Sequence, residues 1–202
     1  MKEDARARRD AQIAEAAYAL LAEKGYGGLS MLAVARRARA SNETLYRWYG
    51  DKTGLFRALI ARNAAQIATA LDRGAADADD PLDILRDLGP RLLTMLLSDR
   101  AVALNRAAAA DATDSLGAVL AEAGRGAILP RIQSLFTRLA ASGVVRSPEE
   151  AAAVYVDLLI GDLQIRRATG AMAAPTSADI ETRARRAEHF VVKTFAPDPG
   201  TP

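Results

Sequence analysis

The sequence predicts an all-α protein with a small N-terminal head and a larger C-terminal helical body. Alanine, leucine, arginine and glutamate recur at helical spacing in almost every segment, whereas the β-branched alternation typical of strands is missing. Ser or Asp precedes most of the expected helices, and Gly follows several of them. The 202 residues, 50% of them hydrophobic, are enough for one large domain or two small ones.

The first expected helix runs from about Arg6 to Lys24, and Gly25 is placed to end it. Its apolar residues repeat at intervals of three and four, so that they form one stripe that can pack over the helices that follow. The residues of this stripe are Ile13, Ala16, Ala17, Leu20 and Leu21.

Residues 30–52 predict a helix-turn-helix. Ser30 can cap a first short helix that reaches about Ala38, and Ser41 can cap a second helix after a tight turn. In the second helix Leu45 and Tyr49 lie four residues apart and share one face. In such a motif the N-terminal part of the second helix enters the major groove of DNA.

The polar side chains of this motif suit a DNA duplex, because amide, hydroxyl and guanidinium groups can bond base edges and phosphates. We expect Asn42 and Thr44 to affect which base is preferred, and Tyr46, Arg47 and Lys52 to contact the backbone. Packing of the small head could instead explain Trp48 and Tyr49. The candidate DNA-binding residues are Ser30, Ser41, Asn42, Thr44, Tyr46, Arg47, Trp48 and Lys52.

Charge is uneven along the chain. Residues 1–60 hold eleven Lys and Arg against seven Asp and Glu, and the remainder holds sixteen against eighteen. This asymmetry fits a DNA-facing head on a neutral or acidic body, although small imbalances are common on solvated surfaces. Arg6, Arg8 and Arg9 could reach phosphates or an adjacent minor groove as a flexible arm, or could form a frayed charged terminus.

The motif resembles that of the TetR family of transcriptional regulators. The family shows Thr or Ser, then Ile/Val-Ala, Ala-Gly-Val-Ser, Thr-Leu-Tyr and an aromatic pair before a Lys. The matching residues here are Ser30, Val34-Ala35, Ala38, Ser41, Thr44-Leu45-Tyr46, Trp48-Tyr49 and Lys52.

Three departures from the family pattern lie in and beside the turn. Arg39 stands where Gly is usual, so it must take a positive φ or the turn must differ, and Ala40 replaces a Val. Asn42-Glu43 replaces the more frequent pair. In the groove, Glu43 either reads the N4 group of cytosine or lies back along the protein surface.

Helices are expected to continue through the middle of the chain. Asp51 can cap a helix that runs from about Lys52 to Arg73, and Asp80-Pro81 starts another, which Gly89-Pro90 kinks or splits. Further helices are expected at about 98–110, from about Asp114 with interruptions at Gly124, Gly126 and Pro130, and onward to Ser142.

Two more helices are expected near the C-terminus. Ser147-Pro148-Glu149-Glu150 has the full capping-box pattern, which predicts one helix from Pro148 to about Thr169. A last helix should run from about Ser177 to Phe195. With a linker at 74–80, we expect a helix-turn-helix domain at 1–51, a connecting helix at 52–73, a regulatory and dimerisation domain at 74–196 and a tail at 197–202.

The helical layout resembles the TetR family along the whole length, and Leu104 to Gly170 resembles its AefR-like C-terminal type. The resemblance implies a ligand-binding and dimerisation domain behind the head. It also implies a homodimeric repressor, released from a palindromic double-stranded DNA operator by a small molecule. The scarcity of His and aromatic residues suggests that this molecule is lipophilic, and without a predicted membrane span or signal peptide we expect a cytoplasmic protein. The last two expected helices would build the dimer interface.

The breaks at Gly89-Pro90 and at Gly124 to Pro130 are places where helices could diverge around a cavity for an apolar ligand. A close-packed core would explain the same side chains. The candidate pocket residues are Leu92, Met95, Leu96, Leu104, Phe136 and Leu158.

Groups for chemistry other than binding are scarce. The chain has one His, His189, and no Cys, so we expect no catalysis, no metal site and no cofactor. The sequence has no run of ~18 apolar residues, so we expect no membrane span. No apolar segment follows the charged N-terminus, so we expect no signal peptide. Two alternatives stay open: a helix-turn-helix regulator without an inducer, and an all-α small-molecule-binding protein or enzyme with an incidental helix-turn-helix.

Overall fold

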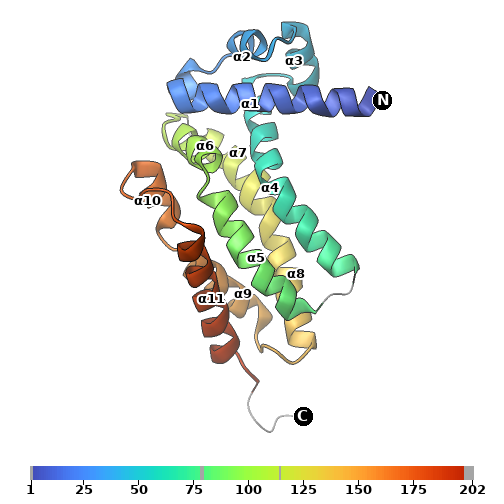
Figure 1. Ribbon diagram of the computed structural model, residues 1–202, viewed down its shortest axis with the longest axis vertical. Helices are drawn as coiled ribbons and strands as arrows, with labels where there is room; N and C mark the ends of the chain where they lie inside the picture. The colour runs from blue at the N-terminus through green and yellow to red at the C-terminus, as the bar shows by residue number, and fades with distance from the viewer. Residues whose placement is uncertain (1, 78–79, 114, 198–202) are drawn as a thin grey trace. The chain divides into compact units, whose positions relative to one another are not determined.

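The computed structural model describes residues 2–77, 80–113 and 115–197, and within these ranges the fold is all-α, as predicted (Figure 1). The predicted linker residues 78 and 79, the predicted helix start at Asp114 and the tail after Pro197 lie outside them. No helix in the described part is long and apolar enough to cross a membrane. In chain order the elements are α1 (Lys2–Gly28), α2 (Met31–Ala38), α3 (Asn42–Tyr49), α4 (Lys52–Ala76), α5 (Pro81–Leu96), α6 (Asp99–Ala109), α7 (Ser115–Leu120), the π-helix η1 (Ala121–Arg125), α8 (Gly126–Ala141), α9 (Pro148–Ile160), α10 (Leu163–Thr169) and α11 (Ser177–Thr194).

The chain forms two compact units, each made of two stretches of sequence. The first unit contains Met1–Asn63 and Asp99–Gly124, and the second contains Ala64–Ser98 and Arg125–Pro202. Helix α4 therefore belongs to both, and residues 99–124 group with the head by compactness. The predicted functional domains at 1–51, 52–73 and 74–196 stay a prediction.

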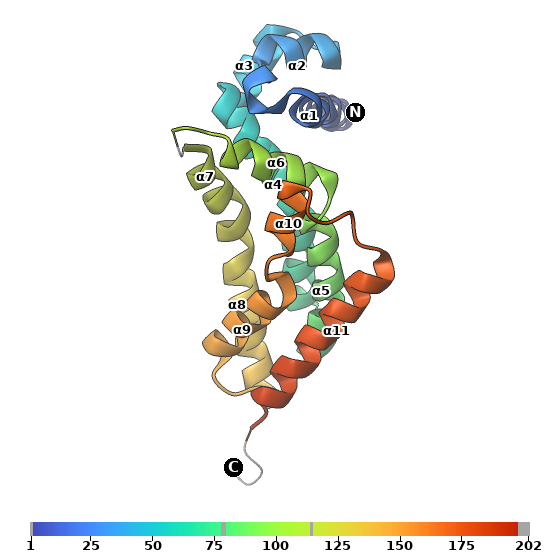
Figure 2. The ribbon, with the colours of Figure 1, turned by 90° about the vertical axis from the view of Figure 1, so that its left-hand side faces the viewer.

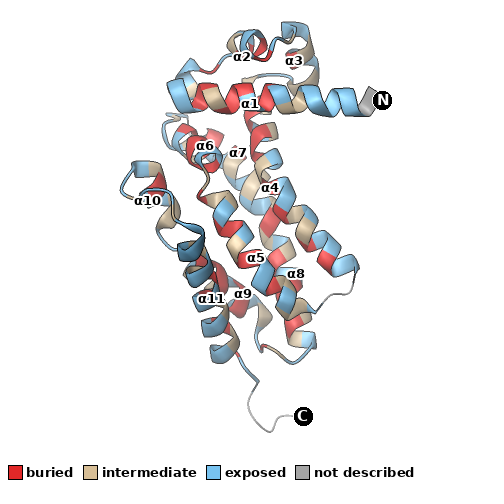
Figure 3. Ribbon diagram, viewed as in Figure 1, coloured by how far each residue is buried: buried red, intermediate tan, exposed pale blue. Residues whose placement is uncertain are grey.

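In the first unit α1 packs against α2 and α6, α2 packs against α3, and α6 packs against α7. Figure 3 shows that the N-terminal turns of α1 are exposed and that its middle is buried. The predicted apolar stripe of α1 lies in this core. Other fully buried side chains of the unit are Leu29, Leu45, Leu55, Phe56, Leu59, Leu104 and Leu116.

In the second unit α5 packs against α8, α9 and α11, and α9 also packs against α8 and α11 (Figure 2). Apolar side chains from these helices and from the second half of α4 make one core. The largest fully buried side chains of this core are Tyr155, Phe136, Leu85 and Leu93.

Helix α1 begins earlier than predicted, and its regular part is interrupted at Gly25, where the sequence predicted its end. It begins at Lys2, so Arg6 to Arg9 lie on a helix, and the flexible-arm interpretation is wrong. Gly25 has φ 64° and ψ −174° and kinks the helix, which continues to Gly28. A Gly takes this conformation without the steric cost that a Cβ imposes.

The predicted interruptions in the middle of the chain are partly wrong. Pro90 lies inside α5, which is not split. Between α7 and α8 the helical path continues through η1, which contains Gly124, so the expected break is a single π-helical segment.

The predicted helix 148–169 is wrong in two respects. Ser147 takes left-handed backbone angles (φ 51°, ψ 63°) and makes no capping bond. An N-cap residue usually has extended backbone angles, which let its side chain bond an N–H of the first turn. Gly161 (φ 49°, ψ −130°) separates α9 from α10, and Arg183 Nε donates to the Leu159 carbonyl at 3.1 Å beside this break. A complete capping box is formed instead by Thr176 and Asp179 at the start of α11.

Candidate nucleic-acid interface

The two predicted capping serines hold the ends of the helix-turn-helix. Ser30 Oγ accepts a hydrogen bond from the Ala33 N–H at 3.1 Å, and Ser41 Oγ accepts one from the Thr44 N–H at 3.1 Å. The Ser41 and Thr44 hydroxyls also lie 2.8 Å apart. Both serines therefore have a structural task, and the Thr44 hydroxyl already has an intramolecular partner.

Arg39 adopts the positive φ that the turn requires. Its backbone angles are φ 51° and ψ 38°, and the following N–H, that of Ala40, donates to the Ala35 carbonyl at 2.9 Å. Left-handed backbone costs a residue with a Cβ about 1–2 kcal/mol. Arg9 Nη1 donates to the Arg39 carbonyl at 3.3 Å, so α1 supports the turn.

One face of α3 is anchored in the head and the other is free. Leu45 is fully buried, whereas Asn42, Glu43, Tyr46 and Arg47 are exposed. None of these four exposed side chains makes a hydrogen bond or ion pair with the part of the chain that the structure describes. The free face therefore presents an amide, a carboxylate, a phenol and a guanidinium to solvent.

Trp48 lies on the anchored side of α3. Its ring makes an edge contact with the Tyr49 ring, with centroids 6.4 Å apart, and the Arg6 guanidinium lies 5.4 Å from its centroid. The side chain is half-buried against the first core. Its contact with DNA stays a prediction, and the structure gives it a packing role as well.

Lys52, at the start of α4, uses its ammonium group within the head. Nζ donates to the Tyr26 carbonyl at 2.6 Å and lies 3.7 Å from the Tyr26 ring centroid. Partial burial lowers the pKa of Lys52. A phosphate contact by Lys52 stays a prediction, and it would have to use the remaining donor directions of this group.

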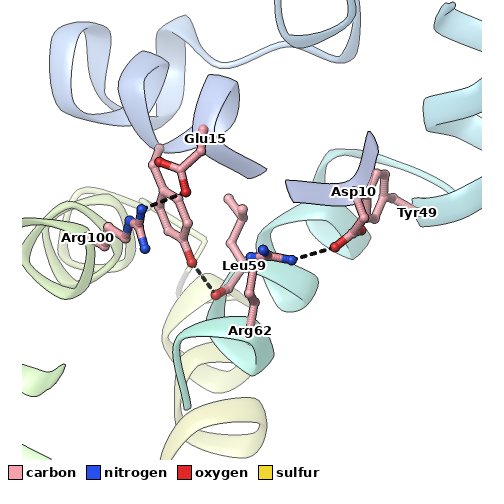
Figure 4. A network of polar contacts seen from close by, with 7 residues as sticks. Asp10, Glu15, Tyr49, Leu59, Arg62 and Arg100 are labelled. Carbon is pink, nitrogen blue, oxygen red and sulfur yellow. Dashed lines mark hydrogen bonds and ion pairs between the residues drawn. The ribbon is translucent and has the colours of Figure 1, made fainter. Parts of the chain in front are cut away.

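Hydrogen bonds between residues far apart in the sequence hold α3 against α1 (Figure 4). Tyr49 Oη donates to Asp10 Oδ1 at 2.6 Å, and Arg62 Nη1 donates to Asp10 Oδ2 at 2.7 Å. Asp10 thus joins α1 to α3 and to α4. Burial and the Asp10 carboxylate raise the pKa of Tyr49, so this hydroxyl stays a donor at neutral pH.

A second set of contacts joins α1 to α4 and α6. Tyr18 Oη donates to the Leu59 carbonyl at 2.6 Å, and Arg100 pairs with Glu15 at 2.6 Å (Figure 4). The Arg100 guanidinium lies 5.3 Å from the Tyr18 ring centroid. Burial raises the pKa of Tyr18 to about 12. No local pattern pointed to these residues, because their partners are far away in the sequence.

The predicted pocket residues do not form one group. Leu92 and Phe136 lie in the core of the second unit, and Met95, Leu96 and Leu158 pack against it. Leu104 lies instead in the core of the first unit. A pocket of about 50 Å³ has another lining, and it is far smaller than the roughly 300–1,000 Å³ typical of ligand pockets. Its lining residues are Leu71, Asp72, Ala75, Ile84, Arg131, Ser134, Leu135 and Arg138.

The second core contains one polar group that sequence reasoning missed. Tyr155 is fully buried, and its hydroxyl has no hydrogen-bond partner among the described residues. A Cβ at Gly89 would lie 2.8 Å from this hydroxyl and 2.9 Å from the Ala184 Cβ, so Gly89 lets α5, Tyr155 and α11 approach closely. Burial raises the pKa of Tyr155, so the group is a neutral donor.

Two family models match the chain. The model of bacterial regulatory proteins of the tetR family matches residues 13–59, and that of the AefR-like transcriptional repressor C-terminal domain matches residues 83–197. The chain belongs to the TetR family of transcriptional regulators. Both parts of the predicted resemblance are confirmed, and the protein is a DNA-binding regulator and not an enzyme.

Solved structures of TetR-family proteins resemble the whole chain. A putative TetR-family regulator from Mesorhizobium loti is 26% identical, with a TM-score of 0.76 over 95% of this chain and 98% of that one. A TetR regulator from Agrobacterium tumefaciens is 30% identical, with a TM-score of 0.73 over 94% and 95%. The Flavonoid-responsive Regulator FrrA is 26% identical, with a TM-score of 0.66 over 96% and 100%. No curated protein matches the chain.

Proposed function

We propose that this TetR-family protein is a repressor that binds a palindromic operator as a homodimer and is released by a small, mostly apolar molecule. The free face of α3 is the observation that carries the DNA-binding part of the proposal. Its exposed Asn42, Tyr46 and Arg47 have no intramolecular partner in the described chain and are therefore available to a duplex.

On this proposal the contacts divide by chemistry. Arg47 and Tyr46 bond phosphates, and Asn42 bonds a base edge. Thr44 contributes through its methyl group or by sharing its hydroxyl, since Ser41 lies 2.8 Å from that oxygen. Lys52 adds positive charge near the backbone.

Exposed apolar side chains support a dimer through the last helices. Among the described residues, two of the large exposed hydrophobic side chains are Ile165 on α10, 60% exposed, and Phe190 on α11, 48% exposed. Burying such side chains against a twin removes apolar surface from water. A twofold dimer would present two copies of α3 to half-sites about one helical turn, ~34–36 Å, apart or a multiple of this. If sedimentation at micromolar concentration shows a strictly monomeric protein, the dimer is ruled out.

Two observations support a small effector. A relative that is 26% identical over nearly the whole chain is named as flavonoid-responsive, and the buried Tyr155 hydroxyl needs a hydrogen-bond acceptor. We place the effector in the second unit, among Leu92, Phe136 and Tyr155. Such a ligand would be mostly apolar and would carry one acceptor for this hydroxyl.

Release from DNA requires little coupling energy. Helix α4 belongs to both compact units, so it gives a continuous covalent path from the second core to Lys52. A tenfold loss of operator affinity needs about 1.4 kcal/mol of coupling. This coupling energy would arise if the effector binds more tightly when the spacing of the two heads differs from that of the half-sites.

The test starts with selection of bound duplexes and continues with a thermal-shift screen of lipophilic compounds. We expect one enriched inverted repeat, and at least one stabilising compound that also releases this duplex. Tyr155→Phe should lower the affinity for that compound more than it lowers the affinity for DNA. If every bound compound leaves the operator complex intact, the regulator without an inducer is the better interpretation.

A further inference from the structure

An acidic side chain stands at the centre of the free face of α3. Glu43 is in the first turn of the helix, two residues before the buried Leu45 and therefore on the opposite side. It is exposed and makes no hydrogen bond or ion pair with any described residue. A carboxylate at this position meets the polyanionic duplex when α3 enters the groove.

Interactions within the protein leave the position of Glu43 unexplained. Arg47 lies four residues later, in the arrangement that favours an ion pair, but the described structure has none between them. Asp87 and Arg91 have the same spacing on α5 and do pair, at 2.6 Å. An acidic side chain near a helix N-terminus interacts favourably with the helix dipole, but an acid at any position of the first turn would do the same.

The chemistry of the groove restricts what Glu43 can face. A carboxylate only accepts hydrogen bonds, so phosphates and the acceptor atoms of guanine and thymine repel it. Adenine carries a donor at N6 beside an acceptor at N7, whereas the donor of cytosine at N4 has no acceptor next to it on the same base. Cytosine is therefore the base edge that best fits an exposed carboxylate.

We propose that Glu43 is a specificity-determining residue, which accepts a hydrogen bond from N4 of a cytosine in each half-site. The proposal rests on the proposed operator recognition and adds the identity of one base. It also gives Glu43 a second effect, because the same carboxylate is repelled wherever the donor is missing. Glu43 thus lowers affinity for wrong sequences, while Arg47 and Tyr46 bind the backbone of any sequence.

The experiment uses the full-length wild type, Glu43→Ala and a control, Glu149→Ala. Glu149 is also in the first turn of a helix, α9, and it is exposed, so the control removes the same charge and the same kind of helix-end interaction. Each protein first selects duplexes from a random pool. Affinities are then measured on the wild-type duplex with cytosine or N4-methylcytosine at the assigned position, the methyl group replacing the hydrogen that faces the groove.

We expect the wild type and Glu149→Ala to select a cytosine and to bind the methylated duplex about tenfold more weakly. Glu43→Ala should lose this preference, should bind both duplexes equally, and should gain affinity for unselected DNA. An unchanged base preference in Glu43→Ala would overturn the role of Glu43 and leave operator recognition intact. A wild type that enriches no sequence would overturn both, so the two failures are distinguishable.

Discussion

The hydroxyl of Tyr18 in the first unit donates to the Leu59 carbonyl at 2.6 Å, whereas the hydroxyl of Tyr155 in the second unit has no partner among the described residues. Both tyrosines are buried. In the first unit, polar bonds such as Tyr49 to Asp10 fix the angles between helices. In the core of the second unit, the Tyr155 hydroxyl lies instead beside Gly89 and makes no such bond with a described residue.

This difference suits the two tasks of the ligand-responsive regulator that we propose. A helix that reads bases must keep its direction, and hydrogen bonds between helices are directional. A core that receives an effector gains from a donor that the protein itself leaves unpaired, because the ligand then supplies a bond that the free protein lacks. On the proposed function, bonds such as that of Tyr49 to Asp10 keep α3 in place, and the Tyr155 hydroxyl is left for an effector to bond.

The largest expected effect compares equal deletions in the two cores. Phe56 and Phe136 are both fully buried, one in each unit. Each change to Ala should cost about 3–5 kcal/mol of unfolding free energy. Trp48, the sole Trp, reports on the head by fluorescence, and circular dichroism reports on all helices. If the two units unfold independently, Phe136→Ala should shift the unfolding midpoint reported by Trp48 fluorescence less than Phe56→Ala does.

Removing the Tyr18 hydroxyl should destabilise the first unit. Tyr18→Phe deletes a buried hydrogen bond to the Leu59 carbonyl, which typically contributes about 1 kcal/mol. Denaturant unfolding followed by Trp48 fluorescence measures the change. A variant as stable as the parent would mean that this bond contributes no net stability.

Removing the Tyr155 hydroxyl should have the opposite sign. Tyr155→Phe deletes a buried hydroxyl that lacks a partner, so we expect a gain of about 1 kcal/mol in the ligand-free protein. The measurement is the same denaturant titration, followed by circular dichroism. A loss of stability would show that the hydroxyl is satisfied in solution and would remove the contrast between the two units.

The turn of the helix-turn-helix offers a smaller test. Arg39 has φ 51°, a conformation that Gly takes without strain. Arg39→Gly should therefore stabilise the head by about 0.5 kcal/mol, since part of the relief is offset by the greater freedom of Gly in the unfolded chain. A decrease in the midpoint of Trp48-monitored unfolding would show that the Arg39 side chain stabilises the head.

Features that depend on neighbouring residues could be predicted from the sequence. Ser30 and Ser41 cap their helices as predicted, because an N-cap bond needs only the next turn. The predicted cap at Ser147 failed, since its backbone is left-handed. Gly161 ends α9 inside an apolar run whose periodicity gave no sign of a break.

Features that depend on the fold could not be predicted in the same way. Leu104 has the same apolar character as Leu92, but it lies in the other core. The bonds of Asp10 to Tyr49 and to Arg62 span 39 and 52 residues of sequence. The hydroxyl of Tyr155, which has no partner among the described residues, is buried beside Gly89, 66 residues earlier in the chain. Position in the fold, rather than residue type, decides each of these roles.

The most direct test of the DNA-binding role of α3 is the salt dependence of binding to the selected duplex. Log affinity should fall linearly with log salt, at about −0.9 per phosphate charge neutralised, and Arg47→Ala should flatten this slope by roughly one to two units in the dimer. Arg91→Ala is the control, because that exposed arginine lies on α5 in the second unit and pairs with Asp87. An unchanged slope in Arg47→Ala, or an equal change in Arg91→Ala, would contradict a backbone contact by the free face of α3.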